Sequence, residues 1–153
     1  MFDLGNMPGH LIRRYHQAAV AIFHREVAEF SYDLTPVQFA ALDRVQESPG
    51  IDQITLAGLI AYDRTTITGV VDRLVQKGWL ERSISVRDRR ARVLHLTDEG
   101  RQVLTVIRPA VEKAQQVMLL GLSEAEADQF LRLLKKATEH VNELSRAPLK
   151  PET

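Results

Sequence analysis

The chain has 153 residues, enough for one domain with a real core. Twenty Lys and Arg side chains balance twenty Asp and Glu side chains, which excludes a uniformly basic surface, and the lack of cysteine excludes disulfides, thiolate metal sites and cysteine nucleophiles. The longest apolar run, Ala18 to Phe23, is far shorter than the roughly 18 residues of a membrane span. Neither a membrane segment nor a signal peptide is expected.

Apolar residues at a helical period predict the first two helices. The first begins at residue 6 or 7, has Pro8 in its first turn and ends near residue 31. Thr35-Pro36-Val37-Gln38 opens the second helix with a capping box, and Ser48-Pro49-Gly50 closes it. Glu26 falls in the middle of the first apolar stripe. Because buried unpaired glutamates are rare, the favoured interpretation is that the stripe leaves the core there; the alternative is a buried carboxylate with a basic partner.

Two short helices and a hairpin are predicted next. The third helix covers roughly Gln53 to Ala61, and the fourth begins after the cap Asp63 and stops at Gly78. Residues 80–82 and 92–96 read as strands, with a polar tip between them over residues 83–91. Two helices with a tight joint followed by a hairpin form a winged helix-turn-helix, in which the second helix enters the major groove of DNA.

The remainder of the chain predicts two long helices. Thr97-Asp98-Glu99 begins the fifth, which extends to about Gly121, and Ser123 to Glu126 is a capping box for the sixth. The tail over residues 148–153 is expected to be frayed. The predicted class is therefore mainly α, with six helices and a small β-hairpin wing.

The net charge of zero hides a positive central segment. Residues 1–62 carry a net charge of −3, residues 63–95 carry +4, and residues 96–153 carry −1. This asymmetry indicates an anionic partner for the central segment.

The fourth helix carries small polar side chains on its exposed face: Arg64, Thr65, Thr66, Thr68 and Gly69. Threonine hydroxyls can bind phosphates or base edges, and threonine methyls can contact the thymine methyl group. Glycine leaves room for close approach to the groove. Taken alone, this face could equally be an ordinary solvated surface.

The hairpin tip favours DNA. Between residues 82 and 92 it has five arginines and one acid, and the arginines are Arg82, Arg87, Arg89, Arg90 and Arg92. Arginine suits phosphates and narrow minor grooves. Asp88 is expected to orient Arg90 by a salt bridge within the wing. The alternative is a solvated turn.

These motifs together resemble the MarR family of bacterial transcriptional regulators. The resemblance rests on Leu56-Ala57, on Asp63 to Leu74 (DRTTITGVVDRL), on Lys77-Gly78, on Asp88-Arg89-Arg90 and on Leu96 to Gly100. It implies that Thr65, Thr66 and Thr68 lie in the major groove, that Arg89 and Arg90 act in the wing, and that Arg73 lies near the DNA backbone or supports the wing. Gly69 departs from the family, in which this residue is often larger and basic.

The resemblance also implies a homodimer on a pseudo-palindromic operator. Residues 1–34 and 101–147 would form the helical dimerisation region and residues 35–100 the DNA-binding domain, in a cytoplasmic, nucleoid-associated protein of a bacterium or archaeon. The expected function is a repressor released by a small ligand, with aromatic compounds as one candidate class and Arg14, His16 and Phe39 as candidate pocket residues. The alternatives are a regulator without a ligand and a winged-helix module that binds protein.

Other classes of function have little support in the sequence. No G-x-S-x-G, P-loop or H-E-x-x-H motif is present, so an enzyme is not expected. His16 and His24 lack neighbouring carboxylates in a ligand pattern, so neither a metal nor another cofactor is expected.

Overall fold

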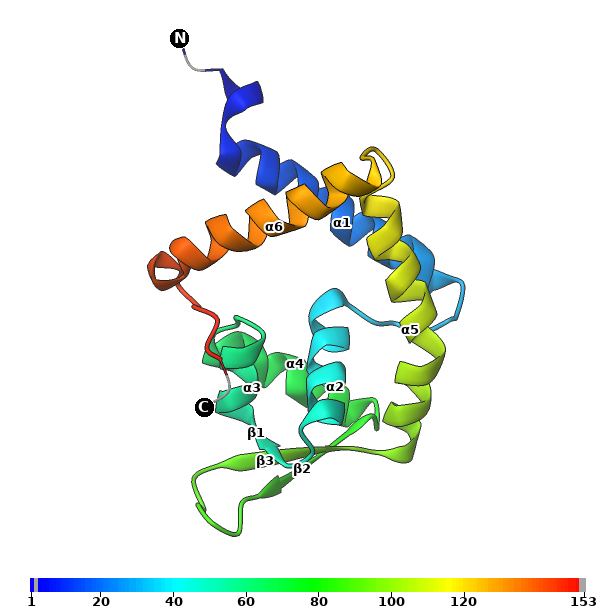
Figure 1. Cartoon of the computed structure of the whole chain (residues 1–153). Coiled ribbons are helices and arrows are strands. Elements are labelled where there is room, and N and C mark those ends of the chain that lie inside the picture. Colours follow the sequence, from blue (N-terminus) through cyan, green and yellow to red (C-terminus); the bar gives the residue numbers. More distant parts are fainter. Residues whose placement is uncertain (2, 152–153) are drawn as a thin grey trace.

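The computed structural model describes residue 1 and residues 3–151. In that part of the chain it contains six α-helices, two 3-10 helices and one three-stranded sheet (Figure 1). The expected class, mainly α with a small β wing, is confirmed. The helices are α1 (Pro8–Ala28), α2 (Pro36–Glu47), α3 (Gln53–Leu59), α4 (Arg64–Gln76), α5 (Asp98–Met118) and α6 (Glu124–His140), the 3-10 helices are η1 (Leu4–Asn6) and η2 (Asn142–Leu144), and the strands are β1 (Ile51–Asp52), β2 (Leu80–Ile84) and β3 (Arg92–Leu96).

The molecule has two ends connected by α5. Helices α1 and α6 lie near the C-terminal half of α5, whereas α3, α4 and the sheet lie at the other end (Figure 1). Tyr15 ties the first end together, because its hydroxyl donates to the carbonyl of Met118 at 2.7 Å and its ring meets the edge of Phe130 from α6, with centroids 5.5 Å apart. No helix of the described residues is both long and apolar enough to cross a membrane.

Side-chain caps begin every helix from α2 to α6. The predicted capping boxes of α2 and α6 are both present, and the side chains of Thr35, Asp52, Asp63, Thr97 and Ser123 each accept a hydrogen bond from a backbone N–H of the first turn. Each cap satisfies a donor that the helix itself leaves unpaired. Helix α3 is shorter than expected, because Ala61 takes a left-handed φ of 56° in the joint before α4.

The sheet is antiparallel in the order β1-β3-β2. The predicted hairpin is present, with Leu80 paired to Leu96, and its first strand runs two residues further than expected, to Ile84. Strand β1, in which Ile51 pairs with Leu94, is not expected from the sequence. Two residues are too few to show a period of two, so only their pairing identifies them as a strand.

The core lies where α2, α4 and α5 meet the sheet. Its fully buried side chains include Leu42, Leu56, Ile67, Leu74, Leu94, Leu104 and Ile107. The same core therefore backs α3, α4 and the wing, which fixes their relative positions.

The junction between the wing and α5 requires glycine. A Cβ on Gly100 would lie 2.1 Å from the carbonyl oxygen of Trp79, so no side chain fits there. Thr97 closes the junction: its hydroxyl donates to the carbonyl of Gly78 at 2.6 Å and accepts from the Gly100 N–H at 3.0 Å. Gly78 has the predicted left-handed conformation, with a φ of 76°.

Glu26 is buried, contrary to the favoured interpretation of the first apolar stripe. Its exposed fraction is 5%. Lys113 of α5 places its Nζ 2.9 Å from Oε2, and Arg25 places a guanidinium nitrogen 3.4 Å from Oε1. The hydrogen bond from Lys113 is the main reason that the pKa of Glu26 is lowered. The stripe stays in the core because a cation from another helix pairs with the carboxylate.

The chain ends also differ from expectation. Helix α1 stops at Ala28, before its expected end near residue 31. Residues 148–151, expected to be frayed, lie against α3: the Lys150 N–H donates to the carbonyl of Gly58 at 2.8 Å. The side chain of Asn142 accepts from the Leu149 N–H at 2.9 Å and donates to its carbonyl at 3.0 Å. We call residues 145–151 the C-terminal strap. Residues 152–153 of the predicted tail lie outside the described part.

Candidate nucleic-acid interface

The N-terminus of α4 is held by its cap. Asp63 accepts from the Thr66 N–H at 2.8 Å and from the Thr66 hydroxyl at 3.0 Å. The backbone hydrogen bond from Thr66 is the main cause of the lowered pKa of Asp63. Arg146 of the strap places a guanidinium nitrogen 3.4 Å from the same carboxylate. The start of the helix is therefore fixed, and its positive dipole end is available to an anion.

Helix α4 has one buried and one exposed face. Ile67, Val70, Val71 and Leu74 are buried in the core. The sequence-predicted residues lie on the other face, and all of them are exposed: Arg64, Thr65, Thr66, Thr68, Gly69 and Arg73. A Cβ at Gly69 would meet no heavy atom within 4 Å, so the fold of this chain does not itself require glycine there.

The three threonines differ in what their hydroxyls can still donate. The Thr66 proton is given to Asp63, and the Thr68 hydroxyl donates to the carbonyl of Arg64 at 2.8 Å. Thr65 has no side-chain hydrogen bond to any described residue. Since a hydroxyl has one proton, Thr65 alone of the three can donate to DNA without breaking an internal bond.

Helix α3 contributes a residue that the sequence analysis did not identify. The side-chain amide of Gln53 donates to the Thr68 hydroxyl at 3.0 Å, which joins α3 to α4. A groove with a volume of about 220 Å³ runs between α3, α4 and the wing; Asp52, Gln53, Ile54, Arg64, Ile67, Thr68, Arg90, Ala91 and Arg92 line it. No local motif marks Gln53, because only the packing of the two helices brings it to Thr68.

Arg82 and Arg92 of the wing turn back onto the protein. Arg82 forms an ion pair with Asp72 of α4, with a distance of 2.6 Å, and so ties the wing to the exposed side of that helix. Asp72 is not expected from the sequence as a partner of the wing. Arg92 turns back onto the tip, where a guanidinium nitrogen donates to the carbonyl of Arg89 at 3.2 Å.

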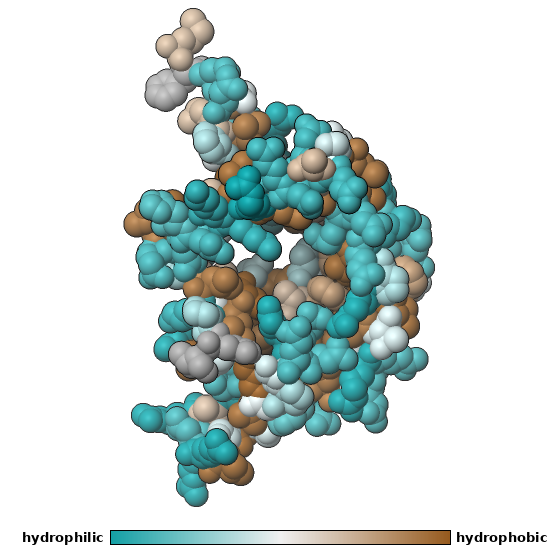
Figure 2. All heavy atoms as spheres, viewed as in Figure 1, coloured by the Kyte–Doolittle hydropathy of each residue, from teal (hydrophilic) through white to brown (hydrophobic). Residues whose placement is uncertain are grey.

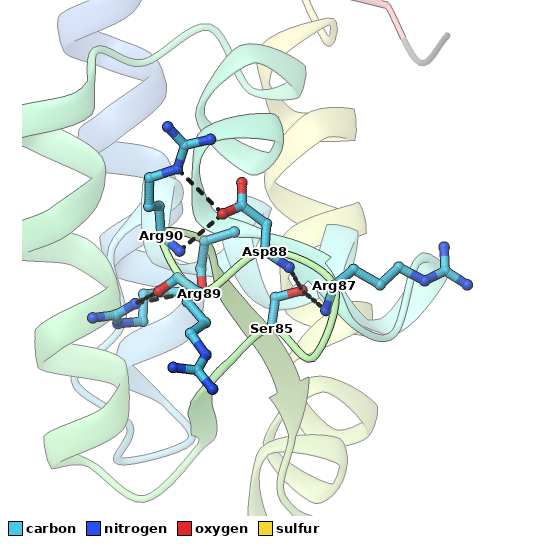
Figure 3. Close-up of polar contacts among 7 residues, drawn as sticks. Ser85, Arg87, Asp88, Arg89 and Arg90 are labelled. Carbon is cyan, nitrogen blue, oxygen red and sulfur yellow. Dashed lines mark hydrogen bonds and ion pairs between the residues drawn. The ribbon is translucent and has the colours of Figure 1, made fainter.

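The other three arginines point outward from the tip. The guanidinium groups of Arg87, Arg89 and Arg90 spread in three directions (Figure 3). Asp88 accepts from the Arg90 N–H at 2.9 Å, and its carboxylate lies 3.4 Å from the Arg90 Nε, so the predicted orienting contact is present. Ser85 accepts from the N–H groups of Arg87 and Asp88 at 3.2 and 3.3 Å and shapes the turn.

The candidate pocket residues are not gathered by any contact in the described part of the chain. Arg14 and His16 are exposed on α1 and have no hydrogen bond or ion pair there. Phe39 packs against the core instead, with its ring 6.5 Å from that of Phe23. Among the described residues no group of three His, Asp or Glu side chains could hold a metal ion.

Sequence comparison agrees with this geometry. The model of the MarR family matches residues 34–91, which contain α2 to α4 and most of the wing. A protein of Thauera aromatica named as a transcriptional regulator of the hcr operon is 36% identical over 135 residues, which cover 86% of this chain and 81% of that protein.

Two solved structures extend the similarity to nearly the whole fold. The PcaV transcriptional regulator from Streptomyces coelicolor, in complex with its natural ligand, has a TM-score of 0.84 and 34% identity over 91% of this chain and 96% of its own. The transcriptional repressor CouR, bound to a 23-mer DNA duplex, has a TM-score of 0.81 and 27% identity over 88% of this chain and 94% of its own. These matches, with the helix pair and wing described above, show that the chain belongs to the MarR family of winged-helix transcriptional regulators.

Proposed function

We propose that two copies of this chain bind a pseudo-palindromic DNA operator and repress transcription until a small ligand releases them. The observation that carries the proposal is the groove bordered both by α4 and by the wing. Thr68 and Arg64 line it from the helix, and Arg90 and Arg92 line it from the tip. A helix in the major groove and an arginine-bearing wing on the adjacent backbone or minor groove would use these two sides together.

Charge supports DNA rather than protein as the partner. The outward guanidinium groups of Arg87, Arg89 and Arg90 meet only one acid of the tip, Asp88. Like charges held this close repel one another, and a phosphate backbone relieves that repulsion. A protein-binding module would not need three outward arginines on one turn.

A second copy of the chain would cover the apolar side of α6. Within the described chain no residue of α6 is buried, and Leu131, Leu133, Leu134 and Val141 are between 37 and 49% exposed. Leu11 and Ile12 of α1 are also exposed. Figure 2 shows an opening beneath α6 with apolar residues gathered on its lower side. Exposed leucines in such a row are typical of an interface, so we assign residues 1–34 and 101–147 to dimerisation and residues 35–100 to DNA binding.

The ligand part of the proposal rests on relatives. PcaV was crystallised with its natural ligand, and CouR is a repressor. We propose Arg14, His16 and Phe39 as residues near a pocket for an aromatic acid. The guanidinium group of Arg14 would form an ion pair with the carboxylate of this ligand. Release requires that the ligand bind the DNA-incompetent arrangement of the dimer more tightly than the competent one.

Selection from a randomised duplex library at physiological salt tests the DNA-binding proposal. The affinity for the selected duplex is then measured at several salt concentrations for the wild type and for Arg89→Ala and Arg90→Ala. We expect each variant to bind more weakly and to flatten the slope of log K against log salt by about two, because a dimer loses two phosphate contacts. A panel of aromatic acids added to the wild-type complex should contain one that lowers the affinity.

Arg44→Ala is the matched control, since Arg44 is an exposed arginine of α2 that pairs with Glu47 and lies neither on α4 nor in the wing. Its slope should equal that of the wild type. Unchanged affinity and slope in both wing variants would refute the role of the wing.

A further inference from the structure

We propose that Thr68 recognises a pyrimidine C5-methyl group, that of thymine in unmodified DNA, and that Gln53 is the positioning residue that turns the Thr68 hydroxyl inward. This inference rests on the proposed function and specifies what the exposed face of α4 reads. Threonine could read a base through either its hydroxyl or its methyl group. The hydrogen bonds around Thr68 distinguish the two.

The Thr68 hydroxyl is bonded on both of its sides within the protein. It donates its single proton to the carbonyl of Arg64 at 2.8 Å, and it accepts from the Gln53 amide at 3.0 Å. These two bonds direct Oγ1 toward the helix backbone and toward α3. The methyl group and Oγ1 are different substituents of the tetrahedral Cβ, so the methyl group points away from these two bonds. Since the Thr68 side chain is exposed, the methyl group is accessible to a ligand.

Gln53 is held firmly in place to make this bond. It is the first residue of α3, directly after Asp52, which caps that helix at 2.8 Å and pairs with Val93 in the sheet. The amide oxygen of Gln53 is buried and accepts no hydrogen bond from the described residues. A buried acceptor without a donor lowers stability. A glutamine that carries this cost while its amide nitrogen bonds Thr68 is better explained by positioning than by folding.

The surroundings of Thr68 suit a methyl group. Ile54, which is 53% exposed, and Ala91 of the wing line the same groove. Arginines also line this groove, so the nonpolar contacts that it offers to an apolar group are those with Ile54, Ala91 and the Thr68 methyl group. Thymine carries its C5-methyl group in the major groove, and uracil lacks it.

Replacing each thymine of the selected duplex in turn by deoxyuridine tests the inference. For the wild-type protein, replacing one symmetry-related pair of thymines should lower the affinity for the duplex about fourfold per half-site, which is the effect of one buried methyl group. Thr68→Ser keeps the hydroxyl and its bonds but not the methyl, so the loss at that pair should disappear. Thr68→Val keeps a methyl group, so replacing thymine by deoxyuridine should still lower its affinity by most of the wild-type factor. A 5-methylcytosine arm tests whether the methyl alone is sufficient.

Gln53→Met tests the positioning role. In the wild-type background it should reduce the ratio of the affinity for the thymine duplex to the affinity for the deoxyuridine duplex at that pair of positions. In the Thr68→Val background, which has no hydroxyl to orient, this ratio of affinities should not change. A merely structural role would lower affinity at all positions equally. Circular dichroism confirms that each variant is folded.

Three results would overturn the inference while leaving the proposed function standing. The first is a selected duplex without thymine in its half-sites. The second is a Thr68→Ser variant whose affinity falls as much as that of the wild type when deoxyuridine replaces thymine at any position. The third is a variant series in which Thr68→Val, but not Thr68→Ser, no longer distinguishes thymine from deoxyuridine. If the wild type selects no duplex, the proposed function itself is wrong.

Discussion

Glu26 shows how one pairing decides the environment of a residue. The carboxylate lies under Lys113 and Arg25, both of which are themselves largely exposed. A buried carboxylate is stable only with such partners. The pair also links α1 to α5, so it contributes to the end of the molecule at which we place the dimer interface.

This arrangement predicts a pH dependence of stability. The pKa of Glu26 is lowered in the folded protein, chiefly by the hydrogen bond from Lys113. Its contribution is therefore complete above the ordinary glutamate pKa of about 4.3 and is lost as the pH falls through the lowered value. We expect Glu26→Gln to have a lower Tm than the wild type at pH 7 and to lose less of it between about pH 5 and pH 3.

Thermal unfolding followed by circular dichroism across this pH range measures the effect. Glu139→Gln, on the exposed surface of α6, is the control and should follow the wild-type curve. Asp63 and Glu126 also have lowered pKa values, so part of the acid sensitivity should persist in Glu26→Gln. A Glu26→Gln curve parallel to that of the wild type would show that the ion pair does not stabilise the fold.

At the scale of elements, the C-terminal strap connects the end of α6 to α3. Lys150 bonds Gly58 through the backbone, and Arg146 approaches the cap of α4. A Cβ added to Gly58 would lie 3.1 Å from the Cβ of Lys150, which is closer than side chains normally pack. The strap thus depends on the small size of residue 58.

We expect Gly58→Ala to loosen the strap. Trypsin cleavage after Arg146 should become roughly threefold faster or more, because local opening exposes the peptide bond. Mass spectrometry of the released C-terminal peptide measures the rate. Gly69→Ala is the matched control, since a Cβ there meets nothing within 4 Å. Equal cleavage rates in Gly58→Ala and the wild type would mean that the strap does not depend on this contact.

The helices and the hairpin could be predicted from sequence because their signals are local. Apolar stripes, capping boxes and the left-handed Gly78 all lie within a few residues of the feature they mark. Strand β1, the partners of Glu26 and the bond from Gln53 to Thr68 could not, since each depends on segments that meet only after folding. The pair of Asp88 with Arg90 could be predicted because the two residues are neighbours in the chain, but the ion pair of Arg82 with Asp72 of α4 could not.

In the whole molecule, α5 connects the end at which we propose dimerisation to the end at which we propose DNA binding. It begins at the wing, where Gly100 packs on Trp79, and ends beside Tyr15 of α1. A change in the packing of α1, α5 and α6 between two copies would move the two α4 helices relative to each other. Since an operator has half-sites roughly 34–36 Å apart, such a movement would weaken DNA binding.

Sedimentation of the wild-type chain, alone and with the selected duplex at physiological salt, shows whether two copies of the chain bind one operator. We expect a dimer in solution and a complex of two chains with one duplex that dissociates steeply as salt is raised. A monomer that forms no complex with any duplex, or a complex insensitive to salt, would contradict it.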